Sequence, residues 1–301
     1  MRRSIAAALL FAALAAPVSA RDVTIDTTTG PVAVPANPET VAVFDIAALD
    51  TLNALGVEVA GIPSPVFLDS LADMAKQATR IGTLFEPDFE ALAVMQPDLI
   101  IAGGRSSTQI KALSKIAPTI DMTIEGDDLL AQARARIVAY GAVFGVPEKA
   151  STLTAALDSK LEDTARAVEG KGDALILLTN GGKISAYGAN GRFGWLHRAL
   201  DLPEAVEGLG AETHGQSVSF EFVAEADPDW LLIIDRGAAI GAEGEAAAAT
   251  LDNPLIARTK AAQNGRIVYL DAAPLYIAAG GANALQHTLD EIKAAFPGGD
   301  S

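Results

Sequence analysis

The sequence predicts an α/β protein of two Rossmann-like lobes, joined by one long rigid α-helix, with a ligand cleft between the lobes. Short apolar runs alternate with helical patterns along the 301 residues, which is typical of sheets covered by helices. A similar helix-to-strand pattern occurs once in each half of the chain. An uninterrupted helical pattern near the middle separates the two halves.

Residues 1–20 have the form of a secretory signal peptide. Arg2 and Arg3 supply a basic start, residues 5–16 are apolar, and residues 18–20 form a small-x-small cleavage site. The apolar stretch is too short to span a bilayer, and no later stretch reaches about 18 apolar residues. Because the chain has no cysteine, disulfides, thiolate metal sites and a lipidated anchor are excluded. We therefore expect a periplasmic protein that is neither lipidated nor anchored to a membrane.

Residues 21–146 are expected to form the N-terminal lobe. Three apolar runs predict strands in it, at residues 41–44, 57–62 and 99–102. The helical pattern of residues 46–55 separates the first two strands and ends at Gly56, a residue type favoured just after a helix. The third strand opens directly into Gly103, Gly104 and Arg105.

A strong helical pattern over residues 147–171 is expected to connect the lobes. Pro147 and Glu148 begin it, where proline is tolerated and an acid is favoured. Leucines at 153, 157 and 161 recur at helical spacing, and Gly170 ends the pattern. About 24 residues would form a rod of about 36 Å, which is stiff enough to limit movement of the lobes against each other.

Residues 172–301 are expected to form the C-terminal lobe. Apolar runs predict strands at residues 173–179, 230–234 and 267–270, and a helix is expected over 193–200. The second half of the chain therefore alternates strands and helices as the first half does.

An internal repeat relates the two predicted lobes. Residues 90–101 (EALAVMQPDLII) and 221–233 (EFVAEADPDWLLI) each begin with a glutamate, reach Pro-Asp seven residues later and continue into an apolar strand. Pro97 and Pro228 would each end a helix and set the turn into the strand. Such wiring is common in α/β proteins, but the matched spacing favours two related lobes.

The chain is strongly acidic, with a formal net charge of −16. Such a charge disfavours nucleic acid and anionic membrane surfaces, so neither is an expected partner. Solubility is the simplest explanation of the acidity. An anionic small ligand would need basic residues gathered locally.

Three arginines occupy positions that suit such a ligand. Arg105 follows the strand at 99–102, Arg236 follows the strand at 230–234, and Arg192 lies in a glycine-rich turn (YGANGRFG). Strand ends in open α/β sheets face the ligand crevice, and guanidinium groups pair well with planar anionic oxygens. Each arginine alone is explained as a solvated surface residue, but three in such positions of an acidic chain favour a binding role.

One histidine and one tyrosine are candidate metal ligands. His214 lies in a polar turn (GAETHGQS) outside any apolar pattern, whereas His197 and His287 fall on expected helices, where structural roles are the default. Tyr276 is expected in a loop after the last strand, where packing is the commoner role. A phenolate is a hard donor that suits iron(III), and a neutral imidazole can share such a site.

Motifs of several other protein classes are absent from the sequence. No histidine cluster has zinc-site spacing, and there is no G-x-S-x-G, Walker loop or G-x-G-x-x-G. The glycines around Arg192 have the wrong spacing for a dinucleotide fingerprint. No base–nucleophile pair is convincing, so we expect a binding protein, not an enzyme, with no permanently bound cofactor.

Five segments in order along the chain carry a family resemblance. They are GGRSS…KIAPT (103–119), YGANGRFGWLH (187–197), THGQSVSFEF (213–222), DNPLIARTKAAQNGRIVYLD (252–271) and LYIAAGG (275–281). The sequence resembles the helical-backbone, class III binding proteins that serve ATP-driven importers of siderophores, haem and cobalamin. Within that class it is most similar to the ferric-catecholate binders related to enterobactin- and petrobactin-binding lipoproteins. The resemblance runs from Val41 to Phe296.

The resemblance implies a role for each candidate residue. Three family arginines that hold negatively charged catecholates match Arg105, Arg192 and Arg236. A family histidine and tyrosine, which complete iron coordination when the siderophore is tetradentate, match His214 and Tyr276. The resemblance thus implies an iron(III)-siderophore, of the catecholate type, as the ligand.

The resemblance also implies protein partners. Family members carry one glutamate on top of each lobe, which meets arginines of the importer's permease, and these match Glu90 and Glu221. The expected partners are therefore a ferric siderophore, an inner-membrane ABC permease and its ATPase, with the binding protein itself a monomer.

Two other functions are compatible with the same residues. A binding protein of this fold could take haem or a cobamide, with Tyr276 or His214 as an axial ligand, although three arginines exceed what the two propionates of haem require. An exported siderophore hydrolase would need an activated nucleophile, and Ser106 and Ser217 lack a paired base. The segment before Tyr276 (DAAPLY) lacks the extra aromatics of the family pattern, so the siderophore is not identified.

Overall fold

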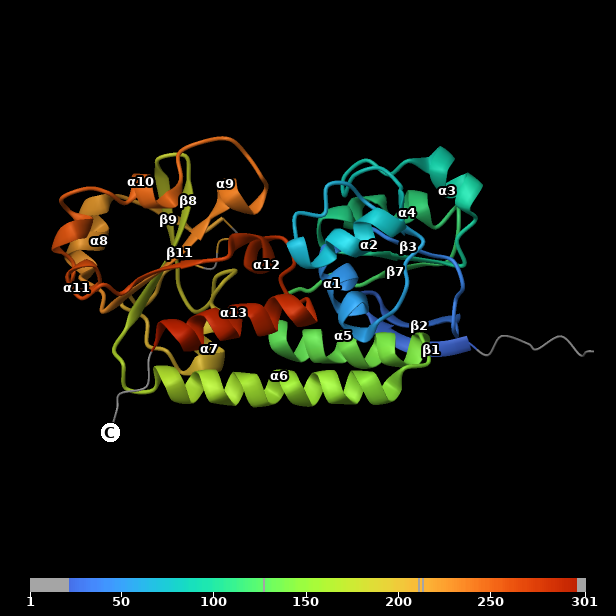
Figure 1. Cartoon of the computed structure of the whole chain (residues 1–301), viewed down its shortest axis with the longest axis horizontal. Helices are drawn as coiled ribbons and strands as arrows, with labels where there is room; N and C mark the ends of the chain where they lie inside the picture. Colours follow the sequence, from blue (N-terminus) through green and yellow to red (C-terminus); the bar gives the residue numbers. More distant parts are fainter. Residues whose placement is uncertain (1–21, 127, 211, 213, 297–301) are drawn as a thin grey trace, which may run out of the picture.

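The computed structural model describes residues 22–126, 128–210, 212 and 214–296, so the predicted signal peptide lies outside the described residues. Figure 1 shows two α/β lobes side by side above a layer of long helices. This arrangement confirms the predicted fold class.

The N-terminal lobe contains a five-stranded parallel sheet with the strand order β5-β4-β3-β6-β7. Its strands are β3 (Val41–Val43), β4 (Gly61–Ile62), β5 (Thr79–Arg80), β6 (Leu99–Ala102) and β7 (Thr119–Asp121). Its helices are α1 (Ile46–Leu55), α2 (Ala72–Gln77), α3 (Phe89–Met95), α4 (Ile110–Leu113) and α5 (Leu129–Val143), with 3₁₀ turns η1 (Asp69–Leu71) and η2 (Gly104–Gln109). A separate antiparallel hairpin, β1 (Asp22–Thr27) and β2 (Gly30–Pro35), precedes them.

The C-terminal lobe contains a mixed five-stranded sheet with the order β10-β9-β8-β11-β12. Its strands are β8 (Ala174–Asn180), β9 (Lys183–Tyr187), β10 (Gln216–Val218), β11 (Trp230–Asp235) and β12 (Ile267–Leu270). The helices are α7 (Trp195–Leu200), α8 (Phe220–Ala226), α9 (Arg236–Ala239), α10 (Ala247–Thr250), α11 (Lys260–Gln263), α12 (Ala272–Tyr276) and α13 (Ala282–Ala295), with the 3₁₀ turn η3 (Ile256–Arg258). Strands β8, β11 and β12 are parallel, whereas β9 and β10 alternate in direction.

The two sheets share one strand order. Numbered along the chain within each lobe, the strands lie in the order 3-2-1-4-5 in both. The repeated sequence pattern falls on equivalent elements, α3–β6 and α8–β11. Each of these helices has seven residues and ends at a left-handed residue, Gln96 (φ 51°) or Asp227 (φ 42°), just before its Pro-Asp turn.

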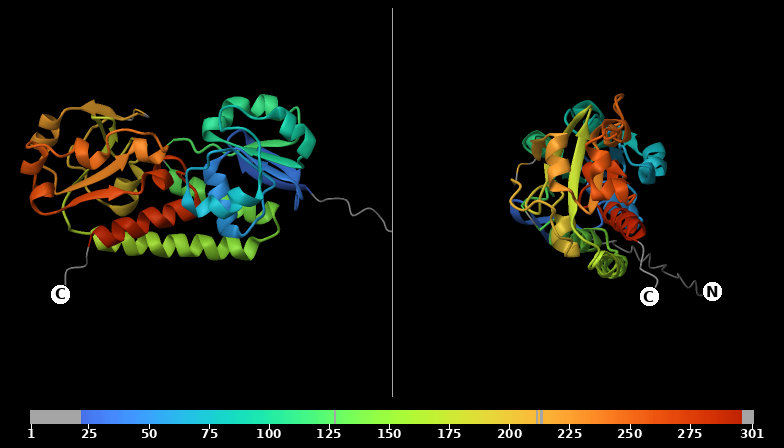
Figure 2. Two further views of the ribbon diagram at one scale, coloured as in Figure 1. Left: turned by 45° about the horizontal axis from the view of Figure 1, so that its top comes forward. Right: turned by 90° about the vertical axis from the view of Figure 1, so that its left-hand side faces the viewer.

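The helix α6 (Pro147–Val168) passes beneath both lobes, with α5 and α13 beside it (Figures 1 and 2). Helices α6 and α13 are fastened by ion pairs of Lys160 with Asp290 and of Lys293 with Asp163 (2.8 Å). Thr164, which is buried, also donates to the carbonyl of Leu289. The connection between the lobes is thus the single helix α6, packed into a layer with α5 and α13.

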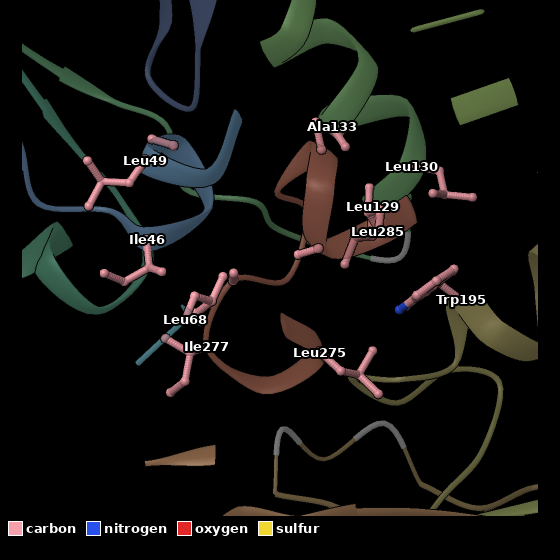
Figure 3. Packing of buried hydrophobic residues seen from close by; sticks show 14 of the residues in the cluster. Ile46, Leu49, Leu68, Leu129, Leu130, Ala133, Trp195, Leu275, Ile277 and Leu285 are labelled. Carbon is pink, nitrogen blue, oxygen red and sulfur yellow. The ribbon is translucent and has the colours of Figure 1, made fainter. Parts of the chain in front are cut away.

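One apolar core extends from lobe to lobe. Figure 3 shows side chains of α1 (Leu49), α5 (Leu130), α7 (Trp195), α12 (Leu275) and α13 (Leu285), all from one cluster of buried residues. Because these helices belong to both halves of the chain, separating the lobes would expose this core to water.

Helix α13 of the C-terminal lobe is capped by residues of α1 in the N-terminal lobe. The buried carboxylate of Asp50 accepts a hydrogen bond from Ala284 N (2.9 Å), and Thr51 Oγ1 accepts one from Ala282 N (3.2 Å). Unpaired N–H groups at the start of a helix need such acceptors. The capping groups therefore come from the opposite lobe.

Some predicted boundaries need correction. The strand expected over 57–62 is only Gly61–Ile62, because Val57 N still bonds to Leu52 O at the end of α1. Tyr276 does not lie in a loop but is the last residue of α12. None of the helices in the described part of the chain is long and apolar enough to cross a membrane.

Candidate functional site

A cavity of about 650 Å³ lies between the two lobes. The N-terminal lobe contributes Asp45, Phe85 and Arg105 to its lining, and the C-terminal lobe contributes Arg192 and Tyr276. In both sheets the chain order reverses between the first and the fourth strand, which is where ligands bind in open α/β sheets. The topology therefore accounts for the position of the cavity.

The residues at these strand ends are polar in each lobe. In the N-terminal lobe, Asp45 follows β3 and Arg105 follows β6. In the C-terminal lobe, Asn180 ends β8 and Arg236 follows β11, and Arg236 Nη1 donates to Asn180 Oδ1 (3.3 Å). The two lobes thus carry polar residues at equivalent strand ends, of which Asp45 and Arg105 line the cavity.

Two glycines position Arg105. A Cβ on Gly103 would lie 2.7 Å from Asp45 Oδ2 and 2.9 Å from the backbone of Met122, so no larger residue fits. Gly104 takes a left-handed backbone (φ 53°) and donates to Thr123 Oγ1 (2.9 Å). These contacts turn the chain from β6 into η2, which aims Arg105 across the cavity.

Arg105 reaches the opposite lobe. Its Nη2 donates to the carbonyl of Tyr276 (3.1 Å), and its Nη1 lies 3.3 Å from the carbonyl of Ile277. Its guanidinium also lies 5.3 Å from the centre of the Tyr276 ring. Arg105, which belongs to the N-terminal lobe, is therefore held by the backbone of the C-terminal lobe.

Arg192 converges on the same residue. Its Nη2 donates to the carbonyl of Tyr276 (2.6 Å), and its guanidinium lies 4.2 Å from the ring centre. Buried Phe193 next to it packs edge-to-face on Tyr187, which anchors the turn. Burial, and then the nearby charge of Arg105, lower the pKa of the Arg192 guanidinium.

Arg236 contacts the other end of the tyrosine. Its Nε donates to the Tyr276 hydroxyl (3.3 Å), but Arg236 is not among the residues that line the cavity. All three predicted arginines therefore meet at one residue, with two guanidiniums at its backbone carbonyl and one at its phenol.

The surroundings of Tyr276 favour its ionised form. Burial alone would raise its pKa, but the hydrogen bond from Arg236 and the charges of Arg192, Arg236 and Arg105 together lower it. A phenol surrounded by guanidiniums loses its proton more readily than a free tyrosine. At this half-buried side chain the guanidiniums therefore outweigh the effect of burial on the pKa.

The three histidines occupy different environments. His214 is exposed in its turn and lines the cavity, but no hydrogen bond joins it to Tyr276 among the described residues. His197 is buried in α7, and its Nδ1 lies 2.9 Å from the carbonyl of Leu202. His287 on α13 lies 3.2 Å from Asp271 at the surface.

The structure adds residues that the sequence did not single out. Asp45, Phe85, Arg136, Tyr140 and Arg198 also line the cavity. Burial raises the pKa of Asp45, opposed by a hydrogen bond from Ala48 N and the charge of Arg136. Asp45 could have been predicted from the sequence as a site residue, because it follows a predicted strand as Arg105 does. Arg136 lies on a helix, where an arginine is usually a surface residue.

The two candidate docking glutamates lie on equivalent helices. Glu90 is in the first turn of α3 and Glu221 is in the first turn of α8, and both are exposed. Hydrogen bonds from its own backbone and from Ser219 lower the pKa of Glu221. Each lobe therefore presents one exposed carboxylate at the start of a matching helix.

Two α/β lobes of one strand order, with a basic cavity between them and a helical layer beneath, define a bilobal solute-binding protein. Residues 41–274 match the family described as periplasmic binding protein, and the chain belongs to that family.

The relatives found include siderophore-binding proteins. The petrobactin-binding protein YclQ of Bacillus subtilis is 36% identical over 86% of this chain and 83% of its own length. Its crystal structure superposes with a TM-score of 0.87 and covers 92% of this chain and 99% of that one. The ferric-anguibactin-binding protein FatB of Vibrio anguillarum is 30% identical over 85% and 81% of the two chains.

A solved structure of a catecholate-binding protein is also similar. The periplasmic catecholate-siderophore binding protein VctP of Vibrio cholerae is 31% identical, has a TM-score of 0.83, and covers 91% of this chain and 100% of that one. These relatives are named as binding proteins, as is the family itself.

Proposed function

We propose that this protein captures an iron(III)-siderophore in the periplasm and delivers it to the permease of an inner-membrane ABC importer. The observation that carries the proposal is the convergence of Arg105, Arg192 and Arg236 on Tyr276 at an interlobe cavity. The siderophore-binding relatives support the same ligand class.

The charge distribution suits an anionic complex. The protein carries a formal charge of −16, yet the guanidiniums of Arg105, Arg136, Arg192 and Arg198 all line one cavity. A ferric catecholate complex has a net negative charge, so it would be repelled by most of the surface and attracted to this place. Hydrogen bonds from guanidinium to anionic oxygen are among the stronger ones in proteins.

The arginines are held in place before a ligand arrives. Each arginine is hydrogen-bonded to Tyr276, so its side chain has little conformational freedom left to lose when a ligand binds. Repulsion between Arg105 and Arg192, which contributes to the lowered pKa of Arg192, would be relieved by an anion between them. Preorganisation and relief of repulsion both favour the bound state.

His214 and Tyr276 would complete the coordination of iron in a tetradentate complex. The guanidiniums that lower the pKa of Tyr276 make its phenolate available as a hard oxygen donor. His214, which also lines the cavity, would supply an imidazole nitrogen. With a hexadentate siderophore neither residue would be needed.

Glu90 and Glu221 would contact the permease. Their exposure, one on each lobe at the start of equivalent helices, suits a partner that straddles both lobes. Arginines on that partner would supply the complementary charge.

Native mass spectrometry of the protein incubated with a ferric catecholate tests the proposal. We expect a 1:1 complex, from which the siderophore is recovered chemically intact after long incubation. Absence of a complex with every ferric siderophore tried would contradict siderophore capture, and recovery of a cleaved ligand would indicate an enzyme instead.

A further inference from the structure

Phe85 is an apolar side chain that the fold leaves in water. Its side chain is 60% exposed, although it is large and aromatic. Single exposed apolar residues are common and need no explanation by themselves. Phe85, however, is one of the residues that line the interlobe cavity.

The loop that carries Phe85 is held tightly. Thr83 Oγ1 accepts hydrogen bonds from Phe85 N (3.2 Å) and Glu86 N (3.0 Å), and Gly82 pairs with Pro87 at the base. Gly82 has a positive φ of 99°, and a Cβ there would meet the backbone of Glu86 and Asp88. The backbone beneath the aromatic ring is therefore fixed by local hydrogen bonds.

The same loop is joined to the segment that carries Arg105. Gln109 Nε2, at the end of η2, donates to the carbonyl of Phe85 (3.0 Å). Since η2 begins at Gly104, this bond ties the aromatic residue to the turn that positions the arginine. A ring and a guanidinium are thus presented to the cavity by one connected part of the N-terminal lobe.

We propose that Phe85 is a specificity-determining residue that packs against an aromatic ring of the bound siderophore. The inference rests on the proposed function. Arginines can hold any anionic ferric complex, whether its donors are carboxylates or catecholates, so they do not select for aryl groups. An aromatic side chain does, because offset or edge-to-face ring pairs gain about 0.5–1.5 kcal/mol beyond the buried area.

Neighbouring apolar residues complete the surface for such a ring. Leu84 is buried next to Phe85, and Ile124 and Ile277 line the same cavity. Two further exposed apolar residues of this region, Phe89 and Val94, lie on α3 and do not line the cavity. Only Phe85 of these three is therefore placed to meet a ligand.

Equilibrium titration of a ferric catecholate into Phe85 variants tests the inference. We expect Phe85→Ala to weaken binding by at least about threefold to tenfold, because it loses buried apolar area as well as the 0.5–1.5 kcal/mol of the ring pair. Phe85→Tyr should retain the wild-type affinity because the ring is kept, and Phe85→Leu should fall between the two. Phe89→Ala is the matched control and should bind as the wild type does.

Two results would overturn the inference. One is equal affinity of Phe85→Ala and wild type; uptake in cells that is lost despite equal affinity would place the ring at the permease. The other is equal affinity of Phe85→Leu and Phe85→Tyr, which would indicate a general apolar contact. A wild-type protein that binds no ferric catecholate would contradict the proposed function itself.

Discussion

Arg105 and Arg192 direct two positive charges at a single backbone carbonyl, that of Tyr276. Two like charges that both lie at one carbonyl repel each other, and the proximity of Arg105 contributes to the lowered pKa of Arg192. An arrangement that is unfavourable without a ligand becomes favourable when an anion occupies the cavity. Under the proposed function, the charge of the ligand would explain why Arg105 and Arg192 lie so close together.

Replacing Arg192 with glutamine should weaken binding of a ferric catecholate. The loss of one partly desolvated, charge-assisted hydrogen bond corresponds to about 1.5–3 kcal/mol, or roughly tenfold to a hundredfold in Kd. Isothermal titration calorimetry would measure the change. Arg166→Gln is the control, because Arg166 is exposed on α6 and pairs with Asp163, away from the cavity. Equal affinity of Arg192→Gln and wild type would contradict a contact with the ligand.

Tyr276→Phe and His214→Ala should affect tetradentate and hexadentate complexes differently. Only a tetradentate ligand leaves two iron positions open, so only its affinity and visible charge-transfer band should change on substitution. Absorption spectra of both complexes with each variant would show this. If neither variant alters the spectrum or the affinity of any tetradentate complex, direct ligation of iron is wrong.

Individual site residues could be predicted from the sequence where the end of a strand could be recognised. Arg105 and Arg236 follow apolar strands, and a glycine-rich turn marked Arg192. Phe85 carried no such signal, because its role depends on a loop whose hydrogen bonds are visible only in the folded chain. Whether a residue faces the cavity depends on tertiary contacts.

Helices α3 and α8 are equivalent elements, and each carries an exposed glutamate in its first turn. Their shared length, left-handed ends and Pro-Asp turns follow from the repeated sequence pattern. The antiparallel pairing of β9 with β8 was not predictable from that pattern. A strand's direction depends on the connection that precedes it, and the short turn after Asn180 forces a hairpin.

Reversing Glu90 and Glu221 to arginine should spare ligand binding and abolish siderophore-dependent uptake. Both residues are exposed and outside the cavity lining, so the cleft should be unaffected, while repulsion would replace attraction at the permease. Uptake of labelled ferric siderophore and affinity in solution would be measured together. Glu148→Arg with Glu169→Arg, at the two ends of α6, is the matched double reversal. Lost ligand affinity in the first double variant would contradict the docking role.

The whole molecule is held together across its lobes by α1 and α13. Asp50 is buried against the start of α13, and burial raises its pKa to about 6, opposed by hydrogen bonds from Ala284 and Asn283. Helix α13 directly follows the segment that contains Tyr276. The contact between lobes is thereby linked to the position of the site, which the sequence could not indicate because the partners are 234 residues apart.

Asp50 should make stability depend on pH. A folded-state pKa near 6, above the unfolded value of 3.8, means that its stabilising contribution is complete below pH 3.8 and is lost as the pH rises through 6. That loss is about 2–3 kcal/mol. The side chain of Asp50→Asn stays neutral at every pH, so this variant does not lose that stability. The unfolding free energy of the variant minus that of the wild type should therefore increase by about 2–3 kcal/mol from pH 4 to pH 7. Urea unfolding at several pH values would measure it, and a pH-independent difference would contradict the assignment.

Tryptophan fluorescence during titration with ferric siderophores tests the central claim most directly. Trp195 is buried and lines the cavity, whereas Trp230 is stacked on Phe296 (3.8 Å) outside the cavity lining. A panel of ferric catecholates, their iron-free forms and haem should give saturable quenching with the ferric catecholates alone. Saturable quenching by haem but by none of the ferric siderophores would contradict the account.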